Sequence, residues 1–145
     1  MDIKALLQSV ELFSGLTDED LDEVAALCNQ YVFNDGDVLA AQGEPGEELF
    51  IIADGLVEVV VRGAETPRVV VNLGSGQLIG EMSLVDQGLR SATVRAIQSP
   101  TTVYAIQYGD FHDLCEQNTR IGYRVMLNLA ADLSFKLRQR HWSGG

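Results

Sequence analysis

The sequence predicts a domain made mainly of β-strands, arranged as a sandwich or barrel of short antiparallel strands with helices at both ends. Between residues 31 and 107, turn signals such as Asp35-Gly36, Asp54-Gly55 and Gly74-Ser75-Gly76 recur at spacings of about eight to twelve residues. Apolar residues at helical spacing precede and follow this region. The length of 145 residues suits one packed core, so residues 1–145 are predicted to form a single domain. We expect helices at about 3–29, strands at about 31–107 and helices again at about 109–141.

The first helical region carries a start signal. Thr17 and Asp20 have the spacing of a capping box, and the acidic residues 18–20 suit the positive end of a helix dipole. Apolar residues then recur at helical spacing: Leu21, Val24, Ala25 and Cys28. We expect the acidic side chains to be solvated rather than to bind a metal.

Five strands stand out in the central region. They are ELFIIADG (48–55), LVEVVVRG (56–63), RVVVNLG (68–74), ATVRAI (92–97) and TTVYAIQ (101–107). In the second of these, Val57, Val59 and Val61 alternate with Glu58, Val60 and Arg62, a pattern that predicts one buried and one wetter face.

The C-terminal region predicts a short helix around Phe111, Leu114 and Cys115 and a longer helix that runs to about Arg140. The longer helix carries an apolar stripe: Met126, Leu129, Ala130, Leu133 and Leu137. Leu127, Ala131 and Phe135 add apolar surface on another side. A homodimer through this helix is therefore a hypothesis.

The charge argues against a nucleic-acid binder, because the formal net charge is −11 and phosphate binding needs an excess of lysine and arginine. From residue 119 onward, however, the chain has five basic residues and only one acidic residue, so this tail carries a net charge of +4 and the remainder −15. Two interpretations stay open: the tail helix docks on an acidic surface of this chain or of a partner, or its cations simply suit the helix C-terminus.

Several absences restrict the function further. No apolar run approaches the roughly 18 residues of a membrane span, and the N-terminus lacks the pattern of a secretory signal. With Cys28 and Cys115 expected as reduced core thiols, the sequence predicts a cytoplasmic protein. His112 and His141 are the only histidines and fall in the tail, and no nucleophile is spaced with a base. We expect no metal, no cofactor and no enzymatic activity.

Residues 77–96 (QLIGEMSLVDQGLRSATVRA) carry the chemistry. Gly80 allows a backbone amide to face a ligand, and a short helical turn from Met82 directs further N–H groups to the same place. Arg90 supplies a planar cation for phosphate oxygens. An ionised Glu81 only accepts hydrogen bonds, so it suits a sugar hydroxyl. An arginine for phosphate and a glutamate for a hydroxyl together predict a nucleotide with an exposed ribose.

The sequence resembles the cyclic-nucleotide-binding domain family over nearly its whole length. The specific signal is IGEMSLVDQGLRSATVRA, which is similar to the family's phosphate-binding cassette, and GDVLAAQGEPGEELFIIADGLVEV is similar to its first strands. The resemblance implies an eight-stranded antiparallel jelly-roll β-barrel with N-terminal helices and a long C-terminal helix. It implies that Glu81 binds the ribose 2′-OH and Arg90 the cyclic phosphate. The remaining expected ligand-binding residues are Ile79, Gly80, Met82, Ser83, Ser91 and Ala92, with the amides of Gly80, Ser83 and Ser91 in the phosphate cradle.

By this resemblance the chain is a non-catalytic receptor for a cyclic nucleotide, cAMP before cGMP, in which ligand binding moves the C-terminal helix to signal to a partner or a fused effector. Lys136 or Arg140 is expected near the purine, and Trp142 is a candidate lid. Leu89 stands where many family members carry proline. Two alternatives stay open: an interaction module whose vestigial pocket binds no nucleotide, and a regulatory piece of a longer channel, transporter or kinase.

Overall fold

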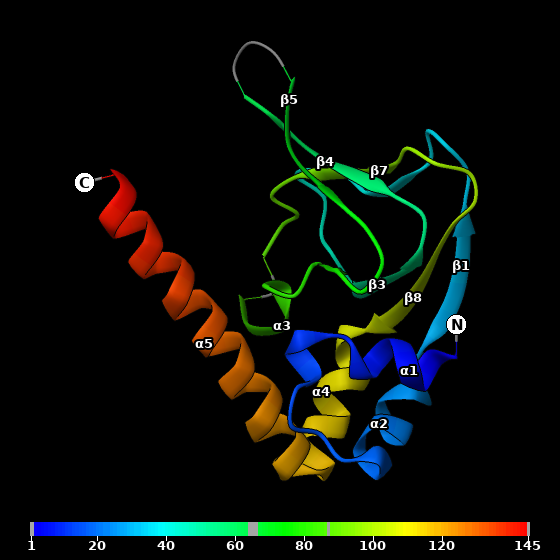
Figure 1. Cartoon of the computed structure of the whole chain (residues 1–145), viewed down its shortest axis with the longest axis vertical. Coiled ribbons are helices and arrows are strands. Elements are labelled where there is room, and N and C mark those ends of the chain that lie inside the picture. The colour runs from blue at the N-terminus through cyan, green and yellow to red at the C-terminus, as the bar shows by residue number, and fades with distance from the viewer. Residues whose placement is uncertain (1, 64–66, 87, 145) are drawn as a thin grey trace.

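Eight strands form two four-stranded antiparallel sheets that face each other (Figure 1). The computed structural model of the chain describes residues 2–63, 67–86 and 88–144, apart from the side chains of residues 67, 69, 70 and 140–144. The strands are β1 (Asn29–Phe33), β2 (Val38–Ala40), β3 (Glu48–Asp54), β4 (Val57–Arg62), β5 (Pro67–Leu73), β6 (Leu78–Ile79), β7 (Thr93–Ala96) and β8 (Thr101–Gln107).

The strand order is β1-β8-β3-β6 in one sheet and β2-β7-β4-β5 in the other, which is a double-sheet jelly roll. The predicted fold class and its eight antiparallel strands are therefore confirmed. The sheets do not close into a barrel, so this detail of the prediction is wrong. The edge strands β2 and β6 have only three and two residues, which is too short for the backbone ladder that would join the sheets.

All five predicted strands are present as β3, β4, β5, β7 and β8. The predicted alternation of buried and wetter side chains along β4 is not observed, because Val57 is buried whereas Val59, Val60 and Val61 are all half-buried. The reason is visible in Figure 1, where the hairpin of β4 and β5 projects beyond the rest of the sheets. Val59 still packs against the cluster between the two sheets, whereas Val60 and Val61 lie towards the projecting end, which has no second layer against which one face can be buried.

The core lies on both faces of the first sheet. Along β3, Leu49 and Ile51 point into a cluster formed with the helices, and Phe50 and Ile52 point into a cluster between the two sheets. All four side chains are at most 4% exposed, as expected for a strand covered on both sides. Helices therefore cover one side of this sheet, and the second sheet covers the other.

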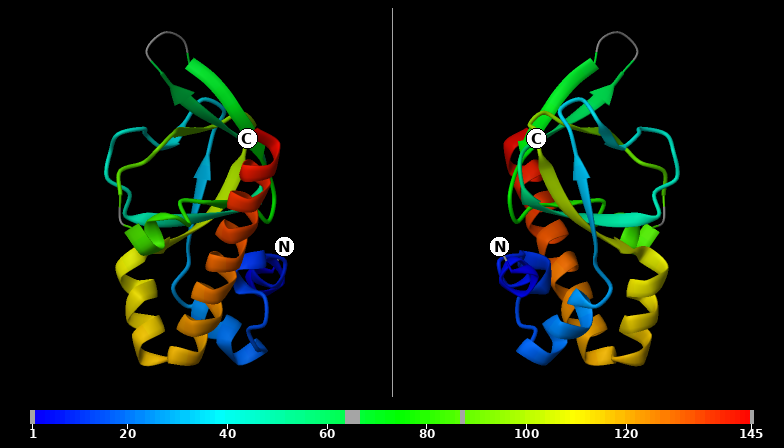
Figure 2. Two further views of the ribbon diagram at one scale, coloured as in Figure 1. Left: turned by 90° about the vertical axis from the view of Figure 1, so that its left-hand side faces the viewer. Right: turned by 90° about the vertical axis from the view of Figure 1, so that its right-hand side faces the viewer.

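The helices are α1 (Ile3–Gln8), the 3-10 helix η1 (Glu11–Phe13), α2 (Asp18–Ala25), α3 (Ser83–Asp86), α4 (Tyr108–Gln117) and α5 (Thr119–Gly144). In both views of Figure 2, the N-terminal helices, α4 and the start of α5 gather at one end of the molecule. The second half of α5 rises beside the strands (Figure 1).

The predicted apolar stripe of α5 is only partly buried. Leu129 is buried and Met126 and Leu133 are half-buried, but Ala130 is exposed and Leu137 is 67% exposed. The buried line is Ile121, Val125 and Leu129, spaced four residues apart, and it packs against α4 and η1. The stripe prediction is wrong for Ala130, which at about 100° per residue lies on the side opposite this line, and for Leu137, which lies beyond Leu133, the last α5 residue that packs against the core.

The predicted capping box of α2 is confirmed, since Thr17 and Asp20 exchange hydrogen bonds at 2.9 and 3.2 Å. The expectation that Asp20 is solvated is wrong, because its side chain is 1% exposed and accepts two hydrogen bonds from the Arg120 guanidinium. This partner lowers the pKa of Asp20 from 3.8 to about 2. At Arg120, the basic tail therefore docks on an acidic group of its own chain.

Candidate functional site

All eight predicted ligand-binding residues line one cavity of about 460 Å³. Side chains of the second sheet form part of its wall, among them Val59, Val71 and Val94, and the loop on both sides of α3 contributes residues 79–83 and 89–92. The volume lies within the range of about 300–1,000 Å³ that is usual for small-molecule sites. Residues that the local chemistry and the family resemblance predict as ligand-binding therefore share one concave surface.

Glu81 is half-buried and lines this cavity together with Arg90. Among the residues that the structure describes, none donates a hydrogen bond to the Glu81 carboxylate. Its oxygens therefore remain able to accept hydrogen bonds from a ligand, and an ionised carboxylate has no donor of its own.

Arg90 is held from several sides. Its Nη1 donates to the Tyr108 hydroxyl at 2.9 Å, and its Nη2 donates to the backbone oxygen of Glu48 at 2.7 Å. Its Cζ lies 5.9 Å from the centroid of the Phe50 ring and 5.8 Å from that of Tyr108. These bonds use two of the five N–H donors of a guanidinium, which leaves three for an anion.

Two glycines make room for this arginine. A Cβ at Gly46 would overlap the Arg90 side chain, and a Cβ at Gly80 would overlap both the Arg90 guanidinium and the Tyr108 hydroxyl. Gly80 also has a φ of +89°, which residues with a Cβ rarely adopt. Gly80, predicted to let a ligand approach the backbone, therefore also leaves room for the Arg90 side chain.

The expected cradle of backbone amides differs in one position. The Ser83 N–H donates to the backbone oxygen of Gly80 at 3.2 Å, so it is already used inside the loop. Within the described part of the chain, no group accepts a hydrogen bond from the N–H of Gly80 or Ser91. Ser83 itself is 7% exposed and lines the cavity.

Sequence reasoning missed Tyr108, which connects the site to the helices. Its hydroxyl donates to the Gly80 oxygen at 2.6 Å while accepting from Arg90. Tyr108 lies 18 residues after Arg90, at the first position of α4. No local motif signals this contact. The available hint is that a buried tyrosine hydroxyl normally has a partner.

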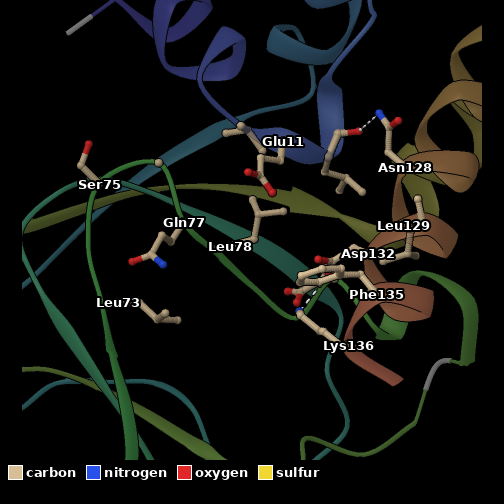
Figure 3. Close-up of a pocket in the computed structure, with 15 residues that line it drawn as sticks. Glu11, Leu73, Ser75, Gln77, Leu78, Asn128, Leu129, Asp132, Phe135 and Lys136 are labelled. Carbon is tan, nitrogen blue, oxygen red and sulfur yellow. Dashed lines mark hydrogen bonds and ion pairs between the residues drawn. The ribbon is translucent and has the colours of Figure 1, made fainter. Parts of the chain in front are cut away.

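A second, larger cavity of about 770 Å³ adjoins the first and shares Leu73, Leu78 and Glu81 with it. Figure 3 shows its walls: η1 contributes Glu11, α5 contributes Phe135 and Lys136, and the segment before β6 contributes Gln77. Lys136, expected near the purine, lines this cavity and not the one that holds Arg90. It forms an ion pair with Asp132 at 2.8 Å, which raises the lysine pKa. The side chains of Arg140 and Trp142 lie outside the described residues.

The sequence also makes predictions about the two cysteines and about membrane-spanning helices. Cys28 and Cys115 are free and half-buried, and burial raises both thiol pKa values, that of Cys28 to about 11. No helix in the described part of the chain is both long and apolar enough to cross a bilayer.

Comparison with known proteins identifies the class. Residues 31–118 match the family described as the cyclic nucleotide-binding domain, and the chain belongs to this family. Domains of this family are regulatory units.

Three relatives illustrate the similarity. The chain is 33% identical to a cyclic AMP receptor protein of Thermus thermophilus over 131 residues, which are 88% of this chain and 57% of that protein. It is 31% identical to a cGMP-dependent protein kinase of Eimeria tenella over 122 residues, 84% of this chain and 12% of the kinase. The N-terminal domain of a transcriptional regulator from Streptomyces coelicolor A3(2) superposes with a TM-score of 0.82 at 26% identity, covering 90% of this chain and 94% of that domain. The chain thus spans only part of the length of both full-length relatives.

Proposed function

We propose that the chain is a non-catalytic receptor domain that binds a cyclic purine mononucleotide, cAMP in preference to cGMP. The observation that carries the proposal is that Glu81 and Arg90 line one cavity beside Gly80, in a chain that belongs to the cyclic nucleotide-binding domain family. A carboxylate acceptor and a cation with free donors on one concave surface suit a sugar hydroxyl and a phosphate in one ligand.

In this proposal Arg90 binds the cyclic phosphate through the N–H groups that Tyr108 and Glu48 do not use, and the amides of Gly80 and Ser91 add donors. Glu81 accepts from the ribose 2′-OH. Ile79, Met82, Ser83 and Ala92 line the remainder of the cavity and contact the ligand.

Two observations support the finer assignments. Of the two full-length relatives named, the cyclic AMP receptor protein is the more identical, at 33% against 31% for the cGMP-dependent protein kinase, which favours cAMP over cGMP. The two cysteines are free thiols, as is usual in a reducing compartment, which supports a cytoplasmic location.

We infer that α5 is the output element. Phe135 and Lys136 face the second cavity, which shares Glu81 with the proposed ligand site. A ligand that occupies Glu81 changes the charge and volume at this shared wall, and α5 moves if one helix position binds the ligand complex more favourably. The partner that receives the signal is a protein or a fused effector domain.

We also infer a homodimer through α5. Tyr123, Leu127 and Leu137 are 67%, 43% and 67% exposed. At about 100° per residue, these three side chains lie within about 40° of a single direction around the helix axis. That direction is on the side opposite Ile121, Val125 and Leu129. A second copy of α5 would cover this apolar line, and sedimentation equilibrium measures whether it does.

The central experiment is binding of cAMP and cGMP, with AMP and ATP as non-cyclic controls. At a ligand concentration of 100 times the Kd, binding to the folded state alone stabilises it by about 2.7 kcal/mol, which raises the Tm by about 5 to 10 °C. Titration calorimetry then compares the parent with Arg90→Ala. Removing a buried partner of the phosphate costs about 2 to 5 kcal/mol, so we expect the Kd to rise at least about 30-fold.

The matched control is Arg95→Ala, because Arg95 is an exposed arginine on β7 that pairs with Glu58 and lies outside the cavity. Its affinity for the nucleotide should equal that of the parent. Arg90→Ala binding cAMP as tightly as the parent would refute the assigned site. A Tm that responds to none of the four nucleotides would instead favour the interaction module with a vestigial pocket.

A further inference from the structure

Tyr108 is hydrogen-bonded to Arg90 and Gly80 through its hydroxyl and to Glu47 through its backbone N–H. The hydroxyl accepts from Arg90 at 2.9 Å and donates to the Gly80 oxygen at 2.6 Å. The backbone N–H donates to the oxygen of Glu47 at 3.0 Å, at the entrance of β3. The residue is 6% exposed and begins α4, so its position is fixed by the helix and by the core.

The guanidinium of Arg90 has little freedom in this setting. It lies near the Tyr108 and Phe50 rings, is bonded to the Glu48 oxygen, and has the Gly46 and Gly80 backbones against it. A long arginine side chain normally loses rotamer freedom when it binds an anion, and a side chain that is already held loses less. The Tyr108 hydroxyl is the only side-chain acceptor of Arg90 among the described residues.

We propose that Tyr108 is a positioning residue: its hydroxyl holds the Arg90 guanidinium in the orientation that binds the ligand phosphate and links that guanidinium to the start of α4. This inference rests on the proposed function of Arg90. Because α4 packs against α5, the Arg90–Tyr108 bond also places the anion site in direct hydrogen-bonded contact with the helical part of the domain.

The test is Tyr108→Phe, which removes the hydroxyl and keeps the ring beside Arg90. The matched control is Tyr104→Phe, since Tyr104 is a half-buried tyrosine on β8 whose hydroxyl has no hydrogen bond to the described residues. Losing a hydrogen bond to a charged group typically changes an equilibrium constant by a factor of about ten or more. We therefore expect the Kd for cAMP to rise about 10-fold in Tyr108→Phe and to stay unchanged in Tyr104→Phe.

A second readout separates positioning from general loosening. At saturating cAMP, the ³¹P chemical shift of the bound phosphate reports the hydrogen bonds around phosphorus. It should differ from the parent value in Tyr108→Phe and match it in Tyr104→Phe. An unchanged Kd together with an unchanged ³¹P shift in Tyr108→Phe would overturn the inference.

A ligand-free measurement keeps this inference distinct from the proposed function. Thermal unfolding of the parent, Arg90→Ala, Tyr108→Phe and the double variant forms a double-mutant cycle. We expect non-additive Tm changes, because the hydroxyl loses its partner once Arg90 is absent. Additive changes would show that the two side chains do not interact and would overturn the inference. If the parent binds no cyclic nucleotide, the proposed function fails and with it the positioning role, whatever the cycle gives.

Discussion

Replacing Asp20 with asparagine tests whether the ion pair between this buried carboxylate on α2 and the exposed Arg120 on α5 stabilises the fold. Asp20 is 1% exposed, accepts two hydrogen bonds from Arg120 and one from the Thr17 N–H at 2.9 Å. Asp20→Asn keeps the size and an acceptor oxygen for Thr17, and it removes the charge that faces Arg120.

The magnitude follows from the pKa of Asp20, which is about 2 in the folded protein against 3.8 without its partners. One pKa unit corresponds to about 1.4 kcal/mol. Because the Arg120 side chain is 59% exposed, solvent screens part of the attraction. We therefore expect Asp20→Asn to lower the free energy of unfolding at pH 7 by about 1 to 2 kcal/mol.

The sign of the pH dependence is fixed by the direction of the shift. A carboxylate whose pKa is lowered by folding stabilises the protein fully above its unfolded pKa, and this contribution is lost as the pH falls from about 4 to about 2. Urea unfolding of parent and variant at pH 7 and at successively lower pH measures it. The difference between them should shrink through that window.

Asp22→Asn is the control, because Asp22 lies on the same helix and its side chain, among the residues described, pairs only with Lys4, in a surface ion pair at 3.2 Å. It should change the free energy of unfolding at pH 7 by less than about 1 kcal/mol. If Asp20→Asn destabilises equally at pH 7 and at the acid end of the window, or no more than Asp22→Asn does, the argument from the ion pair is wrong.

Two further predictions concern the ligand site and the α5 surface. Gly46→Ala places a methyl group against the Arg90 side chain, so titration calorimetry should give a Kd for cAMP raised about 10-fold, whereas Gly109→Ala, with open space at its Cβ, should leave it unchanged. Equal affinities in the two variants would contradict this. Leu127→Asp places a charge on the exposed apolar line of α5, so sedimentation equilibrium should give a monomer where the parent is a dimer. A parent that is monomeric at tens of micromolar would rule out the dimer.

The residues of the site that the sequence predicted lie in one short segment. Residues 79–92 include the glycine, the carboxylate and the arginine, and because both ends of the segment meet at one cavity, local spacing was enough to group them. The contacts that hold Arg90 come from elsewhere: Gly46 before β3, Glu48 within it and Tyr108 after β8. Pairing between distant strands creates these contacts, and it leaves no pattern at any one of the three positions.

The fold shows the same division. Long strands such as β3 and β8 have enough apolar residues to be predicted, whereas β2 and β6, with three and two residues, do not have a period to detect. In α5, apolar spacing fits more than one helix face. Which face is buried depends on where η1 and α4 lie, so the line of Ile121, Val125 and Leu129 was not predicted.

The N-terminal part of α5 is hydrogen-bonded to the N-terminal region of the chain at two positions. Arg120 is bonded to Asp20, and two turns later the Asn128 side chain donates to the backbone oxygens of Leu12 and Ser14 at 2.9 and 2.8 Å. The first part of α5, from Arg120 to Asn128, is thereby bonded to the N-terminal helices and the segment between them. In the proposed movement of α5, the stretch beyond Asn128 would therefore either bend near this residue or move together with the N-terminal helices as one rigid body.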